Sequence, residues 1–526
     1  MATVSEDVAP ADRSAAIDAR VVRVDSTEWS QLAAEVARKR GRLIALWGAD
    51  RSDVGEGLVV YAAFASLEPL ELVPALKGFR GLVCARLPLY GGDSYPDLTP
   101  HFAAANRMQR AAFDMTGVRA DRAIDERPWL RHEAWPADYF PLRNDAPEPA
   151  PPASDEPGYR FVQVAGDGVH EIPVGPIHAG IIEPGHFRFS IVGEKVLRLE
   201  ERLGYVHKGI ERRFQQMAPN DGYRLAGRVS GDSTVAYAWA YCMALEQAAG
   251  CTITPRAAAL RALLLERERI ANHLGDLGAL GNDASLAFGL AQFSRLREDW
   301  LRVNQHLFGH RLLMDRIVPG GVCIDVDRAG ADEMLAHGEA IQREVGALHA
   351  IYDEHAGMQD RFMGTGIVTP ELATRLGLCG LAARASGHPR DLRVDFPCVP
   401  YDRLGVRVAM LPTGDVAARV AVRFDELFES LRLLRLLIAQ LPDGATCVDV
   451  PVLDKEQFGV GWIEGWRGEV LVALDAGPGQ KIRRCHCHDP SWQNWPVLEH
   501  AVIGNIVPDF PLINKSFNLS YSGQDL

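Results

Sequence analysis

The stretch TPRAAALRALLLERERIANHLGDLG, residues 254–278, indicates the fold more strongly than any other part of the chain. Thr254 is suited to cap a helix, and Pro255 fits the first helical turn, where its missing N–H costs nothing. Apolar side chains then recur every three or four residues and form one stripe (Leu260, Leu263, Leu264, Ile270 and Leu274). The pattern predicts a long helix that buries one face against other helices.

Three further segments have the same pattern and are also predicted to be long helices: residues 287–312, 329–354 and 416–441, the last ended by Pro442. Long helices with apolar faces bury most surface when they pack as a bundle. Alternating apolar and polar residues predict strands before and after them: residues 158–174, 186–199, 469–474 and 481–488. Residues 158–526 are therefore expected to form a large domain, a long-helix bundle flanked by β-sheet.

The first 145 residues predict a small α+β domain. Short buried strands are expected at residues 42–47, 57–65 and 82–89, and a helix at 98–115, ended by Gly117. Residues 146–157, APEPAPPASDEP, hold five prolines and three acids and leave little to bury. We predict that they are an extended linker, so the fold class is α+β with two domains joined by a Pro-rich segment.

Composition and charge limit the partners. The chain of 526 residues has 56 Lys and Arg against 69 Asp and Glu, a net charge of −13, which argues against nucleic acid. Its uncharged run, residues 233–245, lies between Asp232 and Glu246 and is too short to span a bilayer. Residues 1–20 resemble neither a secretory signal nor a transit peptide. We expect a cytoplasmic protein that reaches a membrane only through partners.

The nine cysteines are scattered, and no two form a C-x-x-C pair. We expect reduced thiols in the core. The sequence Cys485-His486-Cys487-His488 could suggest a metal site. Alternate residues of a strand face opposite sides, however, which separates the two thiols from the two imidazoles. We therefore do not predict a metal there.

The segment GPIHAGIIEPGHFRF, residues 175–189, is a candidate proton-transfer loop. The ordinary pKa values of a carboxylate and of imidazoles bracket neutral pH. His178, Glu183 and His186 could therefore pass protons along the loop. The alternative is an ordinary polar loop.

Six ordered motifs resemble a known family: LGYVHKGIERRF (203–214), LERERIANHLGDLG (265–278), VPGGV (318–322), ARASGHPRDLRVDFP (383–397), EGWRGEV (464–470) and DPSWQNW (489–495). Together they resemble the large subunit of energy-converting, formate-hydrogenlyase type (group 4) nickel-iron hydrogenases and the quinone-site large subunit of respiratory complex I. Residues 95–118 resemble the small peripheral-arm subunit of complex I. Fusion of the two is a feature of formate-hydrogenlyase type hydrogenases.

The resemblance also shows what this chain lacks. In the hydrogenases two Cys-x-x-Cys pairs hold nickel and iron, because those metals need soft thiolates. The matching positions here are Ser230 and Ser233 in the first motif and Ser520 and Gly523 in the second. We therefore predict no metal in this chain and a hydrogenase-related protein of the non-hydrogenase type, in which the serines are capping or loop residues.

The same resemblance assigns roles to the candidate loop. Glu183 matches the glutamate that moves protons from the metal site in the hydrogenases, and a structural carboxylate is the alternative. If the cavity still handles protons, Glu183 should be partly desolvated among His178, His186 and the two motif segments. In complex I a loop histidine and a tyrosine bind the quinone head. His178 matches the first histidine of that loop. The quinone-bonding histidine lies a few residues later, where His186 is an approximate counterpart, and the tyrosine position falls on Gly231. Tyr237, one helical turn on, could line the same cavity.

The resemblance implies a subunit of a membrane-bound, complex I-like oxidoreductase that couples electron transfer to ion translocation. The implied partners are an iron-sulfur small subunit, a ferredoxin-like subunit and membrane subunits, on the inner face of the cell membrane. Iron-sulfur clusters are expected in the partners and no cofactor in this chain, with quinone a possible ligand. The alternatives are a structural platform, a quinone-reducing subunit and, with least support, a working hydrogenase.

Overall fold

The N-terminal part is a four-stranded sheet covered by helices. The computed structural model describes residues 19–148, 150, 158–178, 182–453, 455–477 and 479–526. The strand order is β1-β4-β3-β2, with β1 parallel to β4 and the other pairs antiparallel. The elements are β1 (Ala19–Arg23), α1 (Ser26–Arg38), β2 (Arg42–Asp50), β3 (Leu58–Ser66), β4 (Gly81–Pro88), β5 (Ser94–Pro96), α2 (Ala105–Thr116) and β6 (Arg119–Asp121).

The strands predicted in this part are confirmed as β2, β3 and β4. The helix predicted over 98–115 begins only at Ala105, because the preceding residues form turns in which the side chain of Gln109 accepts the Leu98 N–H at 3.0 Å. Gly117 ends the helix with a φ of 77°, a conformation that glycine adopts without strain.

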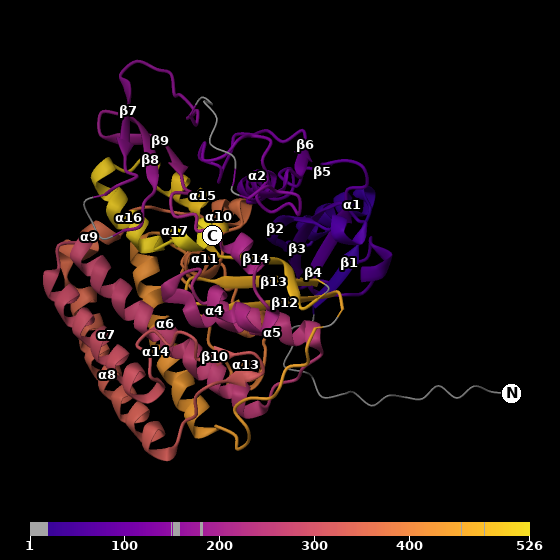
Figure 1. The fold of residues 1–526 in the computed structure, drawn as a ribbon. Coiled ribbons are helices and arrows are strands. Elements are labelled where there is room, and N and C mark those ends of the chain that lie inside the picture. Colours follow the sequence, from indigo (N-terminus) through magenta and orange to yellow (C-terminus); the bar gives the residue numbers. More distant parts are fainter. Residues whose placement is uncertain (1–18, 149, 151–157, 179–181, 454, 478) are drawn as a thin grey trace.

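Four long helices form the bundle of the larger part (Figure 1). They are α6 (Pro255–Asp283), α7 (Ala287–Phe308), α8 (Arg328–Glu354) and α14 (Val416–Ala439). The predicted cap is confirmed, because Thr254 Oγ accepts the Ala257 N–H at 3.1 Å. The uncharged run after Ser233 is α5 (Thr234–Ala249), and most of its side chains are buried. Short helices link the bundle elements: α9 (Ala356–Phe362), α10 (Pro370–Leu376), α11 (Gly380–Arg384), α12 (Leu392–Asp395) and α13 (Tyr401–Leu404).

Two antiparallel three-stranded sheets flank the bundle, ordered β7-β8-β9 and β12-β13-β14. Their strands are β7 (Val169–Val174), β8 (His186–Val192), β9 (Lys195–Arg202), β12 (Gln457–Glu464), β13 (Glu469–Gly477) and β14 (Lys481–His488). Residues 158–168 form no strand, so the first predicted strand is too long. The remaining elements are α3 (Ile210–Phe214), α4 (Gly222–Ala226), β10 (Ile317–Val318), β11 (Gly321–Val322), α15 (Ser491–Ala501), α16 (Phe510–Phe517) and α17 (Tyr521–Asp525).

The N-terminal sheet and the β12-β13-β14 sheet share one apolar cluster. Trp47 and Tyr61 of the first sheet and Trp462 and Leu471 of the second belong to it. Trp47 also stacks on His486 of β14, with ring centroids 4.8 Å apart. The two parts are therefore packed on each other. Residues 149 and 151–157 of the predicted linker lie outside the described residues.

The cysteine prediction is partly wrong. Cys323 and Cys447 are exposed and Cys251 is half-buried, whereas the other six are buried. The two exposed thiols lie in or beside the short β10 and β11 connections rather than in long elements. In β14, Cys485 and Cys487 face the main core while His486 faces Trp47, so the predicted alternation is confirmed.

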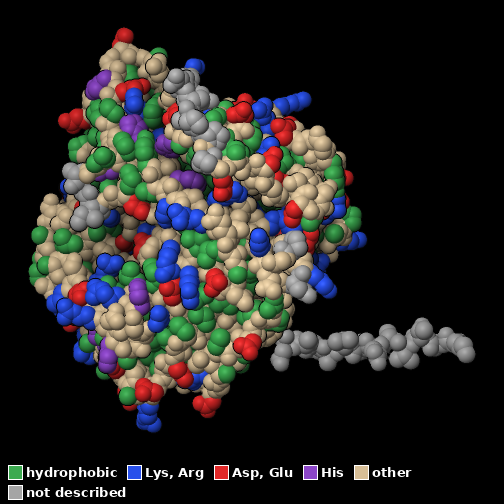
Figure 2. Space-filling view, viewed as in Figure 1, with side chains coloured by type: hydrophobic (Ala, Val, Ile, Leu, Met, Phe, Trp, Pro, Cys, Tyr) green, Lys and Arg blue, Asp and Glu red, His purple; other side chains and the backbone are tan. Residues whose placement is uncertain are grey.

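No helix among the described residues is long and apolar enough to cross a bilayer. Basic and acidic side chains are intermixed over the face in Figure 2.

Replacing Trp47 with alanine should loosen the contact between the two parts. Trp47 is 2% exposed, and removing a buried tryptophan typically costs about 3–5 kcal/mol. Amide hydrogen exchange should rise in both β2 and β14. The control is Trp29→Ala, which removes an equally buried ring inside the N-terminal part and should raise exchange there alone. Unchanged exchange in β14 of the Trp47 variant would contradict a shared core.

Candidate functional site

The two segments that match the metal-binding motifs meet in the interior. Ser230 and Ser233 flank the short turn before α5, and Ser520 directly precedes α17, which lies near the centre of the molecule (Figure 1). The Ser230 and Ser520 hydroxyl oxygens are 3.0 Å apart, and all three serines are at most 4% exposed. The two motif segments therefore meet in space.

The serine hydroxyls are committed to hydrogen bonds. Ser230 Oγ donates to Asp232 Oδ1 at 2.8 Å, so its one proton is used, and the contact with Ser520 must be donated by Ser520. Ser520 Oγ in turn accepts the Gly523 N–H at 2.8 Å and caps α17. Ser520 is thus a capping residue, one of the roles predicted for the serines.

Gly523 occupies the fourth thiolate position, and Asp489 leaves no room for a side chain there. A Cβ added to Gly523 would lie 2.4 Å from Asp489 Oδ2 and 2.9 Å from Ser520 Oγ. Three hydroxyl side chains and a blocked glycine do not offer the soft donors that nickel and iron need. The residues at this position therefore do not fit a dinuclear thiolate centre.

An ion pair holds the first motif in place. Arg467, in the turn between β12 and β13, donates to both carboxylate oxygens of Asp232, at 2.8 and 2.6 Å. It also donates to Ser233 Oγ at 3.3 Å and to the Asn518 carbonyl at 2.5 Å. Desolvation raises the pKa of Asp232, but the Arg467 guanidinium outweighs it and holds that pKa below the ordinary range. Arg467 therefore joins the α5 turn to the C-terminal segment.

Asp489 and Tyr237 form a buried hydrogen-bonded pair beside this ion pair. The Tyr237 hydroxyl donates to Asp489 Oδ2 at 2.8 Å, and the Ser491 N–H donates to Oδ1 at 2.9 Å. Burial raises the pKa of Asp489 although Arg467 lowers it, and burial also raises the pKa of Tyr237 well above its usual value. The Tyr237 hydroxyl is therefore turned to Asp489, and its place in a quinone cavity stays a prediction.

Glu268 of α6 is a further buried acid near the same turn. It is 5% exposed and accepts the Val235 and Ala236 N–H groups of the first turn of α5, at 2.6 and 3.2 Å. Burial raises the pKa of Glu268 to about 8, more than the two N–H groups lower it. This carboxyl is therefore largely protonated at neutral pH.

The candidate loop contacts the second motif through Glu183. Ser522 donates its N–H to Glu183 Oε2 at 3.1 Å and its hydroxyl to Oε1. Glu183 is exposed, so the expected desolvation is wrong and the residue lies at the surface. Residues 179–181 of the loop lie outside the described residues.

The two loop histidines bond to backbone carbonyls and not to Glu183. His178 Nε2 is 2.8 Å from the Gly185 oxygen, and His186 Nδ1 is 3.1 Å from the Gly175 oxygen. Burial lowers the pKa of His186, which therefore favours the neutral form. In this arrangement both imidazoles brace the loop, while Glu183 alone reaches the α17 segment.

Asp525 is a buried acid that the sequence does not single out. It is 0% exposed, accepts the Val206 N–H at 3.0 Å, and its other oxygen has no hydrogen-bond partner among the described residues. Burial raises its pKa to about 7, and the nearby charge of Glu183 adds to the rise. A carboxyl of this kind can take up and release a proton near neutral pH.

Arg467 and Asp489 lie inside motifs that the sequence singles out, EGWRGEV and DPSWQNW, but their pairing with Asp232 and Tyr237 is not predicted. One signal for this pairing is present in the sequence. Asp232 lies between the two serines of the first motif, and an acid at that place needs a cation as its partner.

Comparison with known proteins places this fold among complex I-type subunits. Two family models match: respiratory-chain NADH dehydrogenase, 30 Kd subunit, at residues 22–152, and the 49 Kd subunit at residues 285–459. The fold also resembles a chain in the structure of the membrane-bound sulfane sulfur reductase, an archaeal respiratory membrane complex. The TM-score is 0.65 and the identity 23%, over 69% of this chain and 100% of that chain.

Curated relatives match between about three fifths and nearly all of the chain. Formate hydrogenlyase subunit 5 of Escherichia coli (strain K12) is 32% identical over 93% of this chain and 85% of its own length. A fused NADH-quinone oxidoreductase subunit of Bacteroides thetaiotaomicron is 28% identical over 62% of each chain. The chain therefore belongs to the family of fused 30-kDa-type and 49-kDa-type subunits found in membrane-bound hydrogenases and NADH-quinone oxidoreductases.

Adding a methyl group at Gly523 should destabilise the site. Gly523→Ala places a Cβ against Asp489, and overpacking of this kind typically costs about 1–3 kcal/mol. Chemical denaturation of the variant measures the loss. Gly231→Ala is the matched control, because nothing lies within 4 Å of its added Cβ. In a double-mutant cycle, Asp489→Ala should relieve most of the Gly523→Ala cost. Additive costs would show that Asp489 does not block this position.

Proposed function

We propose that this chain is a subunit of a membrane-bound, complex I-like oxidoreductase that couples electron transfer from an iron-sulfur partner to ion translocation without a nickel-iron centre. The main support is the pair Gly523 and Asp489, because the carboxylate fills the space that a fourth thiolate needs. Family membership supports the first half of the proposal, since the relatives are subunits of hydrogenase and NADH-quinone oxidoreductase complexes.

The proposed partners are an iron-sulfur small subunit, a ferredoxin-like subunit and membrane subunits, which hold this chain at the inner face of the cell membrane. The iron-sulfur clusters belong to the partners, and this chain binds none. The archaeal fold relative is described as part of a respiratory membrane complex, which supports an assembly of this type.

The residues of this chain are suited to proton handling rather than to metal chemistry. Glu183 is exposed and therefore in contact with solvent. Asp525 is buried, and the negative charge of Glu183 helps to raise its pKa to about 7. Deeper in the site, Tyr237 donates to Asp489 while Arg467 holds the Asp232 carboxylate ionised. We propose that protons enter at Glu183 during turnover. For a quinone head, the resemblance offers His186 as an approximate counterpart of the quinone-bonding histidine and Tyr237 as a cavity residue, whose hydroxyl here donates to Asp489.

A structural platform is the second candidate function. It is favoured by the closed bonding of the ligand positions, where Ser230, Ser233 and Ser520 all have hydrogen-bond partners. In that role the subunit transmits conformational change between its partners and its acids do not exchange protons.

The complex should contain no stoichiometric nickel, because its four ligand positions are three serines and a blocked glycine. The chain is purified with its partners from nickel-supplemented cells, and nickel is measured by elemental analysis together with hydrogen uptake. Iron in the same sample reports the partners' clusters and shows that metal was not lost on purification. Near-stoichiometric nickel with hydrogen uptake would refute the proposal.

Glu183→Gln separates the redox subunit from the platform. Glutamine keeps the size and still accepts the Ser522 N–H, but it cannot exchange a proton near neutral pH. We expect normal assembly and at least a roughly tenfold loss of coupled electron transfer, equivalent to ~1.4 kcal/mol of barrier. The control is Glu171→Gln, an exposed carboxylate of β7 paired with Arg188, which should leave the rate unchanged. Full coupled activity of the Glu183 variant in an assembled complex would favour the platform.

A further inference from the structure

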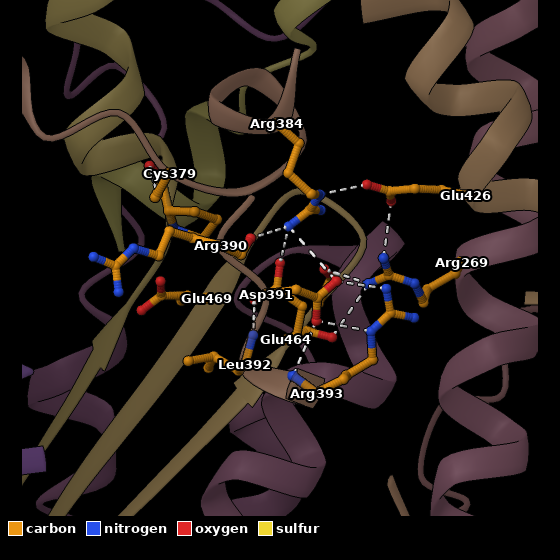
Figure 3. Close-up of polar contacts among 12 residues, drawn as sticks. Arg269, Cys379, Arg384, Arg390, Asp391, Leu392, Arg393, Glu426, Glu464 and Glu469 are labelled. Atoms are coloured by element: carbon orange, nitrogen blue, oxygen red, sulfur yellow. Dashed lines mark hydrogen bonds and ion pairs between the residues drawn. The ribbon is translucent and has the colours of Figure 1, made fainter. Parts of the chain in front are cut away.

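A network of buried charges lies between the bundle and the β12-β13-β14 sheet (Figure 3). It joins α6, α11, the segment around α12, α14 and the end of β12. None of its members is more than 4% exposed. The members are the guanidinium groups of Arg269, Arg384 and Arg393 and the carboxyl groups of Glu266, Asp391, Glu426 and Glu464.

Each arginine bridges two or more acids. Arg384 donates to Glu426 Oε1 at 2.7 Å and to Glu464 Oε1 at 2.8 Å. Arg269 donates to Glu426 Oε2 at 2.9 Å and lies 3.8 Å from Glu266 Oε2. The third bridge is from Arg393 to Asp391 Oδ2 at 2.7 Å and to Glu266 Oε1 at 3.2 Å. The seven groups therefore behave as one electrostatic unit.

The unit contains three cations and four potential anions. A fully ionised network would bury one uncompensated negative charge, which costs several kcal/mol in a low-dielectric interior. The charges next to it do not supply the missing cation, because they are already paired: Arg42 with Glu469, Arg423 with Asp276, and Arg390 with Asp395. Binding one proton costs less free energy than burying the uncompensated negative charge.

Glu464 is the acid with the fewest charged partners. It contacts one guanidinium, that of Arg384, and the Leu392 N–H at 3.2 Å. Asp391 and Glu266 each face two guanidinium groups, and Glu426 faces two guanidinium groups and an imidazole. Protonating Glu464 therefore loses less attraction between acids and guanidinium groups than protonating any other acid of the network.

His273 is the other group that could carry the proton. Its Nε2 lies 3.3 Å from Glu426 Oε2, and its ring is fully buried. Its Nδ1 has no hydrogen-bond partner among the described residues, so an imidazolium would bury an unpaired N–H. Burial lowers the pKa of His273 in agreement with this.

We propose that the network binds one proton and that the Glu464 carboxyl holds it. Burial and the neighbouring Asp391 charge raise the pKa of Glu464 to about 7, which supports the geometric argument. Glu464 ends β12, three residues before Arg467 in the same hairpin. This inference does not depend on the reaction proposed above.

Groups on every element around Glu464 contribute to its environment. They are Arg269, Glu266 and His273 of α6, Arg384 of α11, Asp391 and Arg393 at α12, Tyr401 of α13, Glu426 of α14, Glu469 of β13 with Arg42 of β2, and the Cys379 thiol. Tyr401 and Cys379 remain neutral because burial raises both of their pKa values well above the usual range.

Infrared spectroscopy of the assembled complex tests the proposal, because only a protonated carboxyl gives the C=O stretch of a carboxylic acid. The difference between wild type and Glu464→Gln should show one such band per chain at pH 5, lost with a midpoint near pH 7. Glu464→Asp should shift the band but keep it, and serves if the glutamine variant fails to assemble. No difference band for either variant between pH 5 and 9 would overturn the proposal and leave the compensating charge to His273.

Stability against pH gives an independent readout. A pKa raised on folding means that the folded state binds the proton more tightly, so this contribution is present at low pH and lost as pH rises through about 7. The melting temperature should therefore fall less between pH 5 and 8 in Glu464→Gln than in wild type. Glu246→Gln is the matched control, because Glu246 is paired one-to-one with Arg261 and should lower the melting temperature without changing this pH dependence. Equal pH dependence in wild type and Glu464→Gln would contradict the assignment.

Discussion

The contact of Arg467 with Asp232 is the constraint on which the rest of the site depends. It ties the turn before α5 to the β12-β13 hairpin, and through the Asn518 carbonyl to the C-terminal segment. Because the Asp232 side chain is 35% exposed, water screens the pair, and its own contribution is on the order of 1 kcal/mol. Its importance is geometric: three segments distant in sequence are brought together by one planar, bidentate group.

The four ligand positions show how neighbouring side chains fill the space around small residues in a protein interior. Small side chains at four positions leave volume and unpaired polar groups, and neither is tolerated in a close-packed core. Hydroxyl contacts between Ser230, Ser520 and Asp232 satisfy the polar groups, and Asp489 fills the space beside Gly523. A shortage of partners also marks the Arg-Glu-Asp network, where Glu464 shares its one guanidinium, that of Arg384, with Glu426.

Much of the fold could be predicted from local pattern, and much less of the site. The long helices and the strands β2, β13 and β14 follow from apolar periodicity, and the Thr254 cap from its residue type, because these depend on neighbours along the chain. Of the three predicted loop residues, only Glu183 hydrogen-bonds to the second motif. Its exposure, and the bonding of His178 to a loop carbonyl, depend on how the loop folds back, which no spacing rule encodes.

The sequence by itself determined the fold class, the relation to complex I-type subunits and the loss of the four thiolate positions, because each is a property of residue identity in order. Only the tertiary structure decided which side chains pack against and bond to the residues at those positions. Asp489 meets Gly523, and Glu464 meets Arg384, across 34 and 80 residues of chain, respectively. Electrostatic balance in a buried site is set by distances between such groups, and those distances exist only after the sheets and the bundle have packed together.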